Sequence, residues 1–307
     1  MKNHLTIFLT LMICYCSKHT VAQDLTNKSP VYKHNMAEDY EVSFPEDGGQ
    51  ATLVLFGGFP QRATDIKEEF DFLELAKMHQ LSVVYMNYNR KLWLTDAEKQ
   101  SLSERLVAIF NTLNLSTDKV HIGGFSSGGN IALLLSNYLV ANELSVQPQG
   151  VFVVDSPVDL LELYRLCERN ITRQFSQASM QEAAFLVRFF DHFFGPPEKD
   201  KEPYEEHSPY TSETKNIENL SSLDGVKIRF YSEPDAQWWK DNRQNEPTDM
   251  NAHWIEKLST QLAEELPNTR VEYITTEDKG YRANGDRHPH SWSIVDQEEL
   301  VRWMLGN

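Results

Sequence analysis

The sequence has few cysteines, and this argues against a fold held together by disulfide bonds. Its 307 residues contain three cysteines, and two of these, Cys14 and Cys16, lie in an N-terminal segment that we expect to be removed. The remaining Cys167 cannot form an intramolecular bridge by itself. A chain of this length can bury a large hydrophobic core, so we expect the core alone to stabilise the fold.

Positive charge is also scarce, and the sequence has no internal repeat. The chain has 29 lysines and arginines against 45 acidic residues, a formal net charge of −16. This balance makes nucleic acid a poor partner. We interpret the excess of acidic residues as a solvated surface rather than as a sign of a cationic substrate.

The N-terminus has the pattern of a secretory signal peptide over residues 1–22. A basic start at Lys2 is followed by an apolar run over residues 5–16 and by small residues before Gln23. The run is shorter than the roughly 20 residues that a membrane-spanning helix needs. Large residues precede both of its cysteines, which disfavours a lipid anchor. We expect a secreted or periplasmic protein without a stable membrane span in its mature chain.

The rest of the chain alternates between strand and helix patterns, which predicts one α/β domain over residues 23–307 with a mostly parallel sheet covered by helices. An opening antiparallel strand is expected near residues 40–44, and an inserted helical cap over residues 158–223, where helical patterns continue without a strand. Further strands are expected at 51–56, 81–88, 120–123, 151–155, 226–231 and 271–275, and helices at 68–80, 97–111, 130–140, 253–265 and 294–305.

Aromatic residues gather in the expected cap and in a polar, irregular segment over residues 234–250. Phe189 and Phe190 belong to two neighbouring rows of one helix, and Trp238 lies in the polar segment. These three side chains are candidates for substrate contacts. The alternative, that the aromatic side chains of the cap only pack it onto the core, is the more common role of such rows.

The most informative motif is Gly-x-Ser-x-Gly at residues 124–128. A β-rich run precedes it, and a buried helix pattern without glycine or proline follows over residues 130–140. This order is typical of a nucleophile elbow, in which a serine stands on a tight turn between a strand and a helix. Ser126 is therefore the candidate nucleophile.

A serine nucleophile needs a base, and the segment after the last strand offers two histidines. We prefer His290, which comes just before the last helix pattern, over His288, which a proline follows. Their spacing also suggests a metal site, but a third nearby ligand is missing from the pattern. We expect no metal and no organic cofactor.

The acid that orients the base should stand at the carboxyl end of a strand, where the active sites of open α/β sheets lie. Asp235 is our first choice because it follows the strand at 226–231. Glu233, beside it, and Asp155, at the end of the strand after the elbow, are the alternatives.

Backbone amides should bind the oxyanion. Gly57 and Gly58 form a tight turn after a strand, and the amide of Phe59 is our first choice as donor. The second donor would be the amide of Ser127, directly after the candidate nucleophile.

With these motifs in the order serine, aspartate, histidine, the sequence resembles the α/β-hydrolase fold superfamily, and within it serine esterases and lipases. Residues 57–60 look like the His-Gly-x-Pro oxyanion turn, residues 232–235 like the Gly-x-x-Asp acid turn, and residues 290–292 like the histidine loop. The sequence departs from the family in having Gly57 in place of histidine and in the long separation between Asp235 and His290.

The resemblance implies a serine hydrolase that cleaves a small-molecule or lipid-like carboxylic ester through an acyl-enzyme, with Ser126, Asp235 and His290 as its triad. A serine peptidase on the same fold and a catalytically silent binding protein are the alternatives, because fold and motif do not distinguish them. Acyl length, leaving group and oligomeric state stay open.

Overall fold

A computed structural model describes residues 31–306 and shows one eight-stranded sheet. The strands are ordered β1-β2-β4-β3-β5-β6-β7-β8. Strand β2 runs antiparallel to both of its neighbours, β1 and β4, and all other neighbouring strands are parallel. The predicted signal peptide at residues 1–22 lies outside the described residues, so export stays a prediction. The strands are β1 (Tyr32–Met36), β2 (Tyr40–Pro45), β3 (Ala51–Phe56), β4 (Leu81–Met86), β5 (Val120–Phe125), β6 (Pro148–Val154), β7 (Lys227–Ser232) and β8 (Val271–Thr275).

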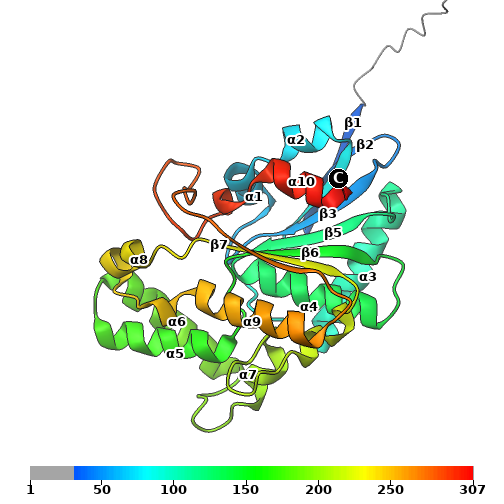
Figure 1. Ribbon diagram of the computed structural model, residues 1–307. Coiled ribbons are helices and arrows are strands. Elements are labelled where there is room, and N and C mark those ends of the chain that lie inside the picture. The colour runs from blue at the N-terminus through cyan, green and yellow to red at the C-terminus, as the bar shows by residue number, and fades with distance from the viewer. Residues whose placement is uncertain (1–30, 307) are drawn as a thin grey trace, which may run out of the picture.

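Helices cover both faces of the sheet, as Figure 1 shows. The central strands β3, β4 and β5 are buried along their whole length, because each of their faces packs against helices. One face carries α1 (Ala63–Phe70), α2 (Leu73–Met78) and α10 (Gln297–Leu305), and the other carries α3 (Asp96–Leu113), α4 (Ser127–Ala141) and α9 (Asn251–Glu265).

A helical insert stands between β6 and β7, where the sequence predicted a cap over residues 158–223. It consists of α5 (Leu160–Arg173), α6 (Gln177–Phe193), α7 (Glu202–His207) and the 3-10 helix η1 (Glu218–Leu223). The predicted fold class, a mostly parallel sheet covered by helices with a helical insert, is therefore confirmed (Figure 1).

Three local predictions were wrong or incomplete. Strand β1 was not predicted, because its exposed residues lack the apolar pattern of a core strand. The helix expected at 68–80 is two helices, α1 and α2, separated by Asp71 in the left-handed conformation (φ 35°). The segment 234–250, expected to be irregular, contains α8 (Ala236–Arg243) and η2 (Pro247–Asp249).

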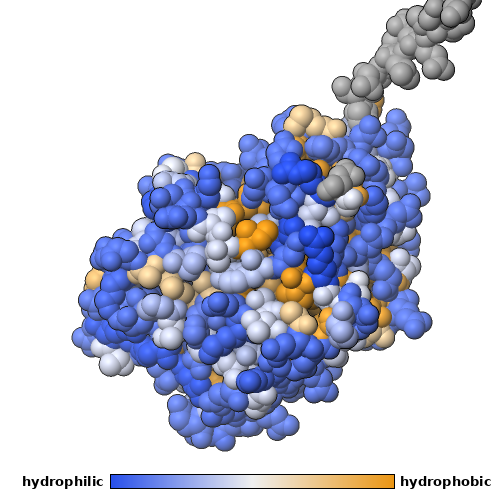
Figure 2. Space-filling model, in the orientation of Figure 1, coloured by the Kyte–Doolittle hydropathy of each residue, from blue (hydrophilic) through white to orange (hydrophobic). Residues whose placement is uncertain are grey.

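The surface agrees with the acidic composition. Hydrophilic side chains cover most of the face shown in Figure 2. Among the described residues, no helix is both long enough and apolar enough to cross a membrane. Cys167 is a free, buried thiol.

Candidate active site

Ser126 stands on a sharp turn between β5 and α4, as the motif predicted. Its backbone angles are φ 53° and ψ −129°, a conformation that is strained for any residue with a side chain. A Cβ atom on Gly124 would lie 2.1 Å from the carbonyl oxygen of Gly128, and one on Gly128 would lie 2.3 Å from that of Phe56. Only glycine fits at these two positions, so the motif keeps strand and helix close enough to expose the serine.

The turn after β3 lies directly against this serine. A Cβ atom on Gly58 would lie 2.9 Å from the Cβ atom of Ser126. The amide of Gly58 donates to Oε1 of Gln61 (3.0 Å), and the described residues include no hydrogen bond from the amide of Phe59. The amide of Ser127 belongs to the first turn of α4, where helix amides have no partner within the helix. Phe59 and Ser127, whose amides were predicted as oxyanion donors, line the same cavity as Ser126.

Gln61 holds the turn in shape, and sequence reasoning missed it. Its side-chain oxygen accepts hydrogen bonds from the amide of Gly58 and from the indole nitrogen of Trp292 (3.2 Å). A Cβ atom on Gly57 would lie 2.7 Å from the Cβ atom of Gln61, so the glutamine occupies the space that a larger residue at position 57 would need. Gln61 thus supports the turn although position 57 has glycine in place of histidine.

His290 pairs with Asp155. The Nδ1 atom of His290 lies 2.6 Å from Oδ2 of Asp155, which follows β6 and is only 5% exposed. The imidazole also packs on the ring of Phe125, with 4.4 Å between the ring centroids. These two contacts hold the ring beside the elbow, with Nδ1 engaged by the carboxylate.

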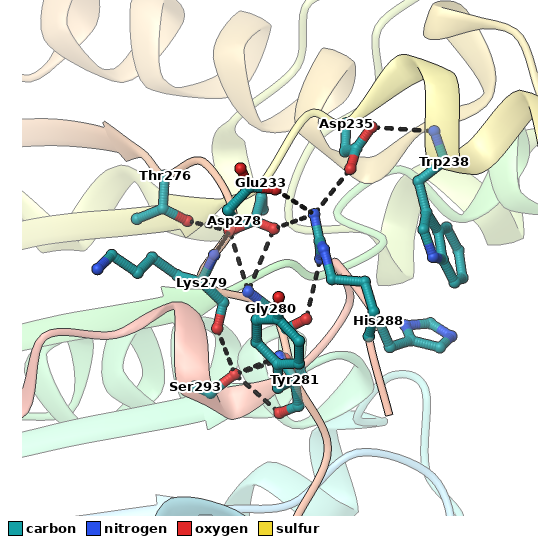
Figure 3. Close-up of polar contacts among 12 residues, drawn as sticks. Glu233, Asp235, Trp238, Thr276, Asp278, Lys279, Gly280, Tyr281, His288 and Ser293 are labelled. Atoms are coloured by element: carbon teal, nitrogen blue, oxygen red, sulfur yellow. Dashed lines mark hydrogen bonds and ion pairs between the residues drawn. The ribbon is translucent and has the colours of Figure 1, made fainter. Parts of the chain in front are cut away.

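The first choice for the acid, Asp235, does not contact His290. Its carboxylate caps α8 by accepting from the amide of Trp238 (2.9 Å), and it pairs with Arg287 (2.7 Å). The prediction that Asp235 orients His290 is therefore wrong, and the reason is that this carboxylate is occupied by a helix terminus and an arginine (Figure 3).

Glu233, the second alternative, holds the backbone of the long segment after β8, residues 276–293. This segment contains residues 290–292, and the whole of it is called the histidine loop from here on. This buried carboxylate accepts from the hydroxyl of Thr276 (2.9 Å) and from the amides of Lys279 (2.8 Å) and Gly280, and it pairs with Arg287 (2.6 Å). Arg287 in turn donates to the carbonyl of Gly280 (2.9 Å). Figure 3 shows Glu233 beside Thr276, Lys279 and Gly280. These partners follow Glu233 by 43 to 47 residues, so no short sequence motif reveals the contact.

His288, the histidine that was not preferred, supports its neighbour. Its Nδ1 atom accepts from the amide of His290 (3.2 Å), and its ring packs on that of Trp238 at 4.6 Å. Burial lowers the pKa of His288 to about 3, so its imidazole is neutral near pH 7 and can accept this bond.

A cavity of about 450 Å³ joins these groups to the helical insert. Ser126, Ser127, His290 and Phe59 line one side of it. The opposite side is largely apolar and includes Leu163, Leu166, Ala183, Phe185 and Leu186 from α5 and α6. Polar and charged side chains also line the cavity, among them Glu182, Asp249 and Arg282. A concave site that combines an apolar wall with polar groups is the usual form of a small-molecule site.

Two of the aromatic residues predicted to contact substrate, Phe189 and Phe190, lie one helical turn away from residues of α6 that line the cavity. Phe190 is completely buried and packs on Trp93 and Tyr204, so it stabilises the insert. Phe189 packs on Trp93 at 5.4 Å, and it is Phe185, one turn earlier, that lines the cavity.

Trp238 is the third aromatic residue that was misplaced. Its ring lies against His288, whereas the neighbouring Trp239 lines the cavity. Helical phase decides which side of α8 faces inward, and the segment had been predicted as irregular, without a helix that begins at Ala236.

Comparison with known proteins reveals similarity only at the level of structure. No protein-family model matches the sequence, and no curated protein matches it. A fungal esterase from Rhizomucor miehei superimposes with a TM-score of 0.58 and 15% identity, over 90% of this chain and 83% of that one. An inhibited esterase B from Lactobacillus rhamnosis gives 0.55 and 14%, over 91% and 87%. A hormone-sensitive lipase from a metagenome library gives 0.54 and 13%, over 91% and 86%.

The protein has the α/β-hydrolase fold. The fold that the sequence motifs suggested is thus confirmed across about nine tenths of the chain. Within this α/β-hydrolase fold, the elbow, the glycine turn and the histidine loop lie where their order along the chain predicted. The pairing of the histidine with the acid after β6 was only an alternative at the level of sequence.

Proposed function

We propose that the protein is a serine hydrolase that cleaves carboxylic esters, with Ser126 as nucleophile, His290 as general base and Asp155 as the orienting acid. The observation that carries the proposal is the 2.6 Å contact between Nδ1 of His290 and Asp155, beside a cavity that the strained Ser126 also lines. A serine and a histidine held by a buried carboxylate are the arrangement that activates a weak hydroxyl nucleophile.

In the proposed reaction, Nε2 of His290 accepts the proton of the Ser126 hydroxyl as its oxygen attacks the ester carbonyl. Asp155 stabilises the imidazolium that forms. The amides of Phe59 and Ser127 donate hydrogen bonds to the oxyanion. His290 then returns the proton to the departing alcohol, and a water molecule, activated by the same histidine, releases the acid from Ser126.

An ester is the preferred substrate for two reasons. Three similar structures are described as esterases or lipases. The largely apolar wall from α5 and α6 also fits an acyl or alkyl group of moderate size in a cavity of about 450 Å³.

The substitution Ser126→Ala tests the proposal. We expect turnover of p-nitrophenyl butyrate to fall by roughly 10⁴-fold or more, because the nucleophile is lost. The purified protein should react with a fluorophosphonate probe at Ser126, and peptide mapping would locate the label. Ser136→Ala, which changes a serine further along α4, is the matched control and should retain both turnover and labelling.

Unchanged turnover in Ser126→Ala, or a label on another residue, would contradict the proposal. An amide of the same acyl group, butyranilide, separates the two hydrolase classes. We expect the ester to react far faster, and preferential cleavage of the amide would favour the peptidase alternative.

A further inference from the structure

The cavity contains one arginine without an acidic partner. Among the charged residues that line it, Glu182 pairs with Arg243 (3.1 Å) and Asp249 pairs with Arg173 (2.6 Å). Arg282 also lines the cavity, and within residues 31–306 no ion pair or side-chain hydrogen bond involves its guanidinium. The guanidinium of Arg282 therefore has no partner at ion-pair distance, and Glu69 and Asp155 act on its charge only from further away.

This charge is placed close to the reacting groups. The guanidinium of Arg282 lies over the ring of Phe125, 5.7 Å from its centroid, and the same ring packs on His290. Arg282 stands at the tip of the histidine loop, which Tyr281 and Arg287 close by an antiparallel bridge. At this tip the amide of Ala283 donates a hydrogen bond to the carboxylate of Glu69 (3.2 Å). Glu69 does not form an ion pair with Arg282. The loop thus holds the cation at the cavity beside the elbow.

Holding a partly buried cation without a partner is costly, because burial removes water from the charge. Burial correspondingly lowers the pKa of the Arg282 guanidinium from its ordinary value. A ligand with a negative group would remove this cost. The chain as a whole carries a net charge of −16, so an anionic ligand has a reason to bind at this cation in preference to most of the surface.

We propose that Arg282 binds a negatively charged group of the substrate, and that the protein prefers esters carrying a second, anionic group such as a carboxylate. The planar guanidinium offers two parallel donors that match the two oxygens of a carboxylate. The inference rests on the proposed ester hydrolysis at Ser126. The carboxylate can belong to the acyl part or to the alcohol part of the ester, and both place it near the scissile bond.

Two matched pairs of substrates test the preference. Mono-p-nitrophenyl succinate against p-nitrophenyl butyrate places the carboxylate on the acyl part, and 4-carboxyphenyl acetate against phenyl acetate places it on the leaving group. The measured quantity is the ratio of kcat/KM for the anionic ester to that for its neutral partner. Ser126→Ala supplies the blank for spontaneous hydrolysis of the succinate.

In Arg282→Gln we expect this ratio to fall by about tenfold or more in one of the two pairs, the loss expected for a hydrogen bond to a charged group. Arg282→Lys should restore part of the ratio, since it keeps the charge and loses the fork. Arg105→Gln is the matched control. Arg105 does not line the cavity and its guanidinium already pairs with Asp39, so the ratio should change by less than about threefold.

A ratio that is unaffected by Arg282→Gln in both pairs would overturn the inference. Equal losses for the neutral and the anionic ester would do the same, because they would indicate that Arg282 only packs on Phe125. These results are distinguishable from failure of the proposed function. If p-nitrophenyl butyrate is cleaved through Ser126 while both ratios stay constant, only the role of Arg282 is refuted.

Discussion

Acidic residues that follow two neighbouring strands, β6 and β7, hold the histidine loop in different ways. After β6, Asp155 contacts the imidazole of His290 itself. After β7, Glu233 and Asp235 contact the loop backbone, Arg287 and the start of α8. All three carboxylates stand at strand ends, where sequence reasoning expects the orienting acid.

The difference shows that position at a strand end does not decide the role of a carboxylate. The partner decides it. Asp155 is free to face a ring, whereas every oxygen of Glu233 and Asp235 is engaged with amides, a hydroxyl or a guanidinium. We therefore expect substitutions after β6 to affect the rate of reaction, and substitutions after β7 to affect the stability of the loop.

The largest expected effect is that of Asp155→Asn. An amide at this position no longer stabilises the imidazolium and favours the wrong tautomer of His290, so kcat should fall by roughly 10³- to 10⁴-fold. Steady-state hydrolysis of p-nitrophenyl butyrate measures this. Asp235→Asn is the matched control after β7, and its loss should stay below about tenfold, since only a helix cap and one ion pair are changed.

The opposite order, with Asp235→Asn as the more damaging substitution, would reverse the comparison. It would return Asp235 to the role that the sequence first suggested. Circular dichroism of both variants shows whether either loss reflects unfolding.

Glu233→Gln is expected to act mainly on stability. The substitution leaves Arg287 facing a neutral, buried side chain, and breaking a buried ion pair by changing one partner costs about 3–5 kcal/mol. Asp235 still pairs with Arg287, so we expect the lower end of this range. Urea unfolding measures the free energy of unfolding. The control is Glu298→Gln in α10, whose side chain is 60% exposed and which should change stability very little.

A Glu233→Gln protein with unchanged stability and a large loss of kcat would contradict the expectation that residues after β7 act on stability. It would mean that Glu233 acts on the reacting groups through the loop rather than on the fold.

The sequence predicted the positions of seven of the eight strands along the chain and the residues of the elbow, because these depend on local patterns. Gly124 and Gly128 are required by contacts that any strand, turn and helix of this kind would make. The pairing of His290 with Asp155 depends on how two segments 135 residues apart meet in space, and residue types alone left three carboxylates as candidates. The inward side of α6 and α8 likewise depends on helical phase, so Phe185 and Trp239 were missed in favour of their neighbours.

The smallest expected effect concerns the other histidine of the loop. His288 faces Trp238 and Trp239 and has no carboxylate partner among the described residues, and burial lowers its pKa to about 3. It therefore stays neutral over pH 5–9, and His288→Asn should leave the shape of the pH profile of kcat/KM unchanged. Asparagine retains an acceptor for the amide of His290.

The same substitution has an effect on acid stability whose sign is fixed. In the unfolded chain this histidine binds a proton as the pH falls through about 6.5, whereas the folded protein does not until about pH 3. The unfolded state thus binds more protons in this window, and the folded state loses stability as the pH falls. Removing the group should shift the midpoint of acid unfolding of His288→Asn to a lower pH than that of the wild type. A midpoint shifted to higher pH would indicate that His288 is charged in the folded protein and is stabilised there by an acidic group.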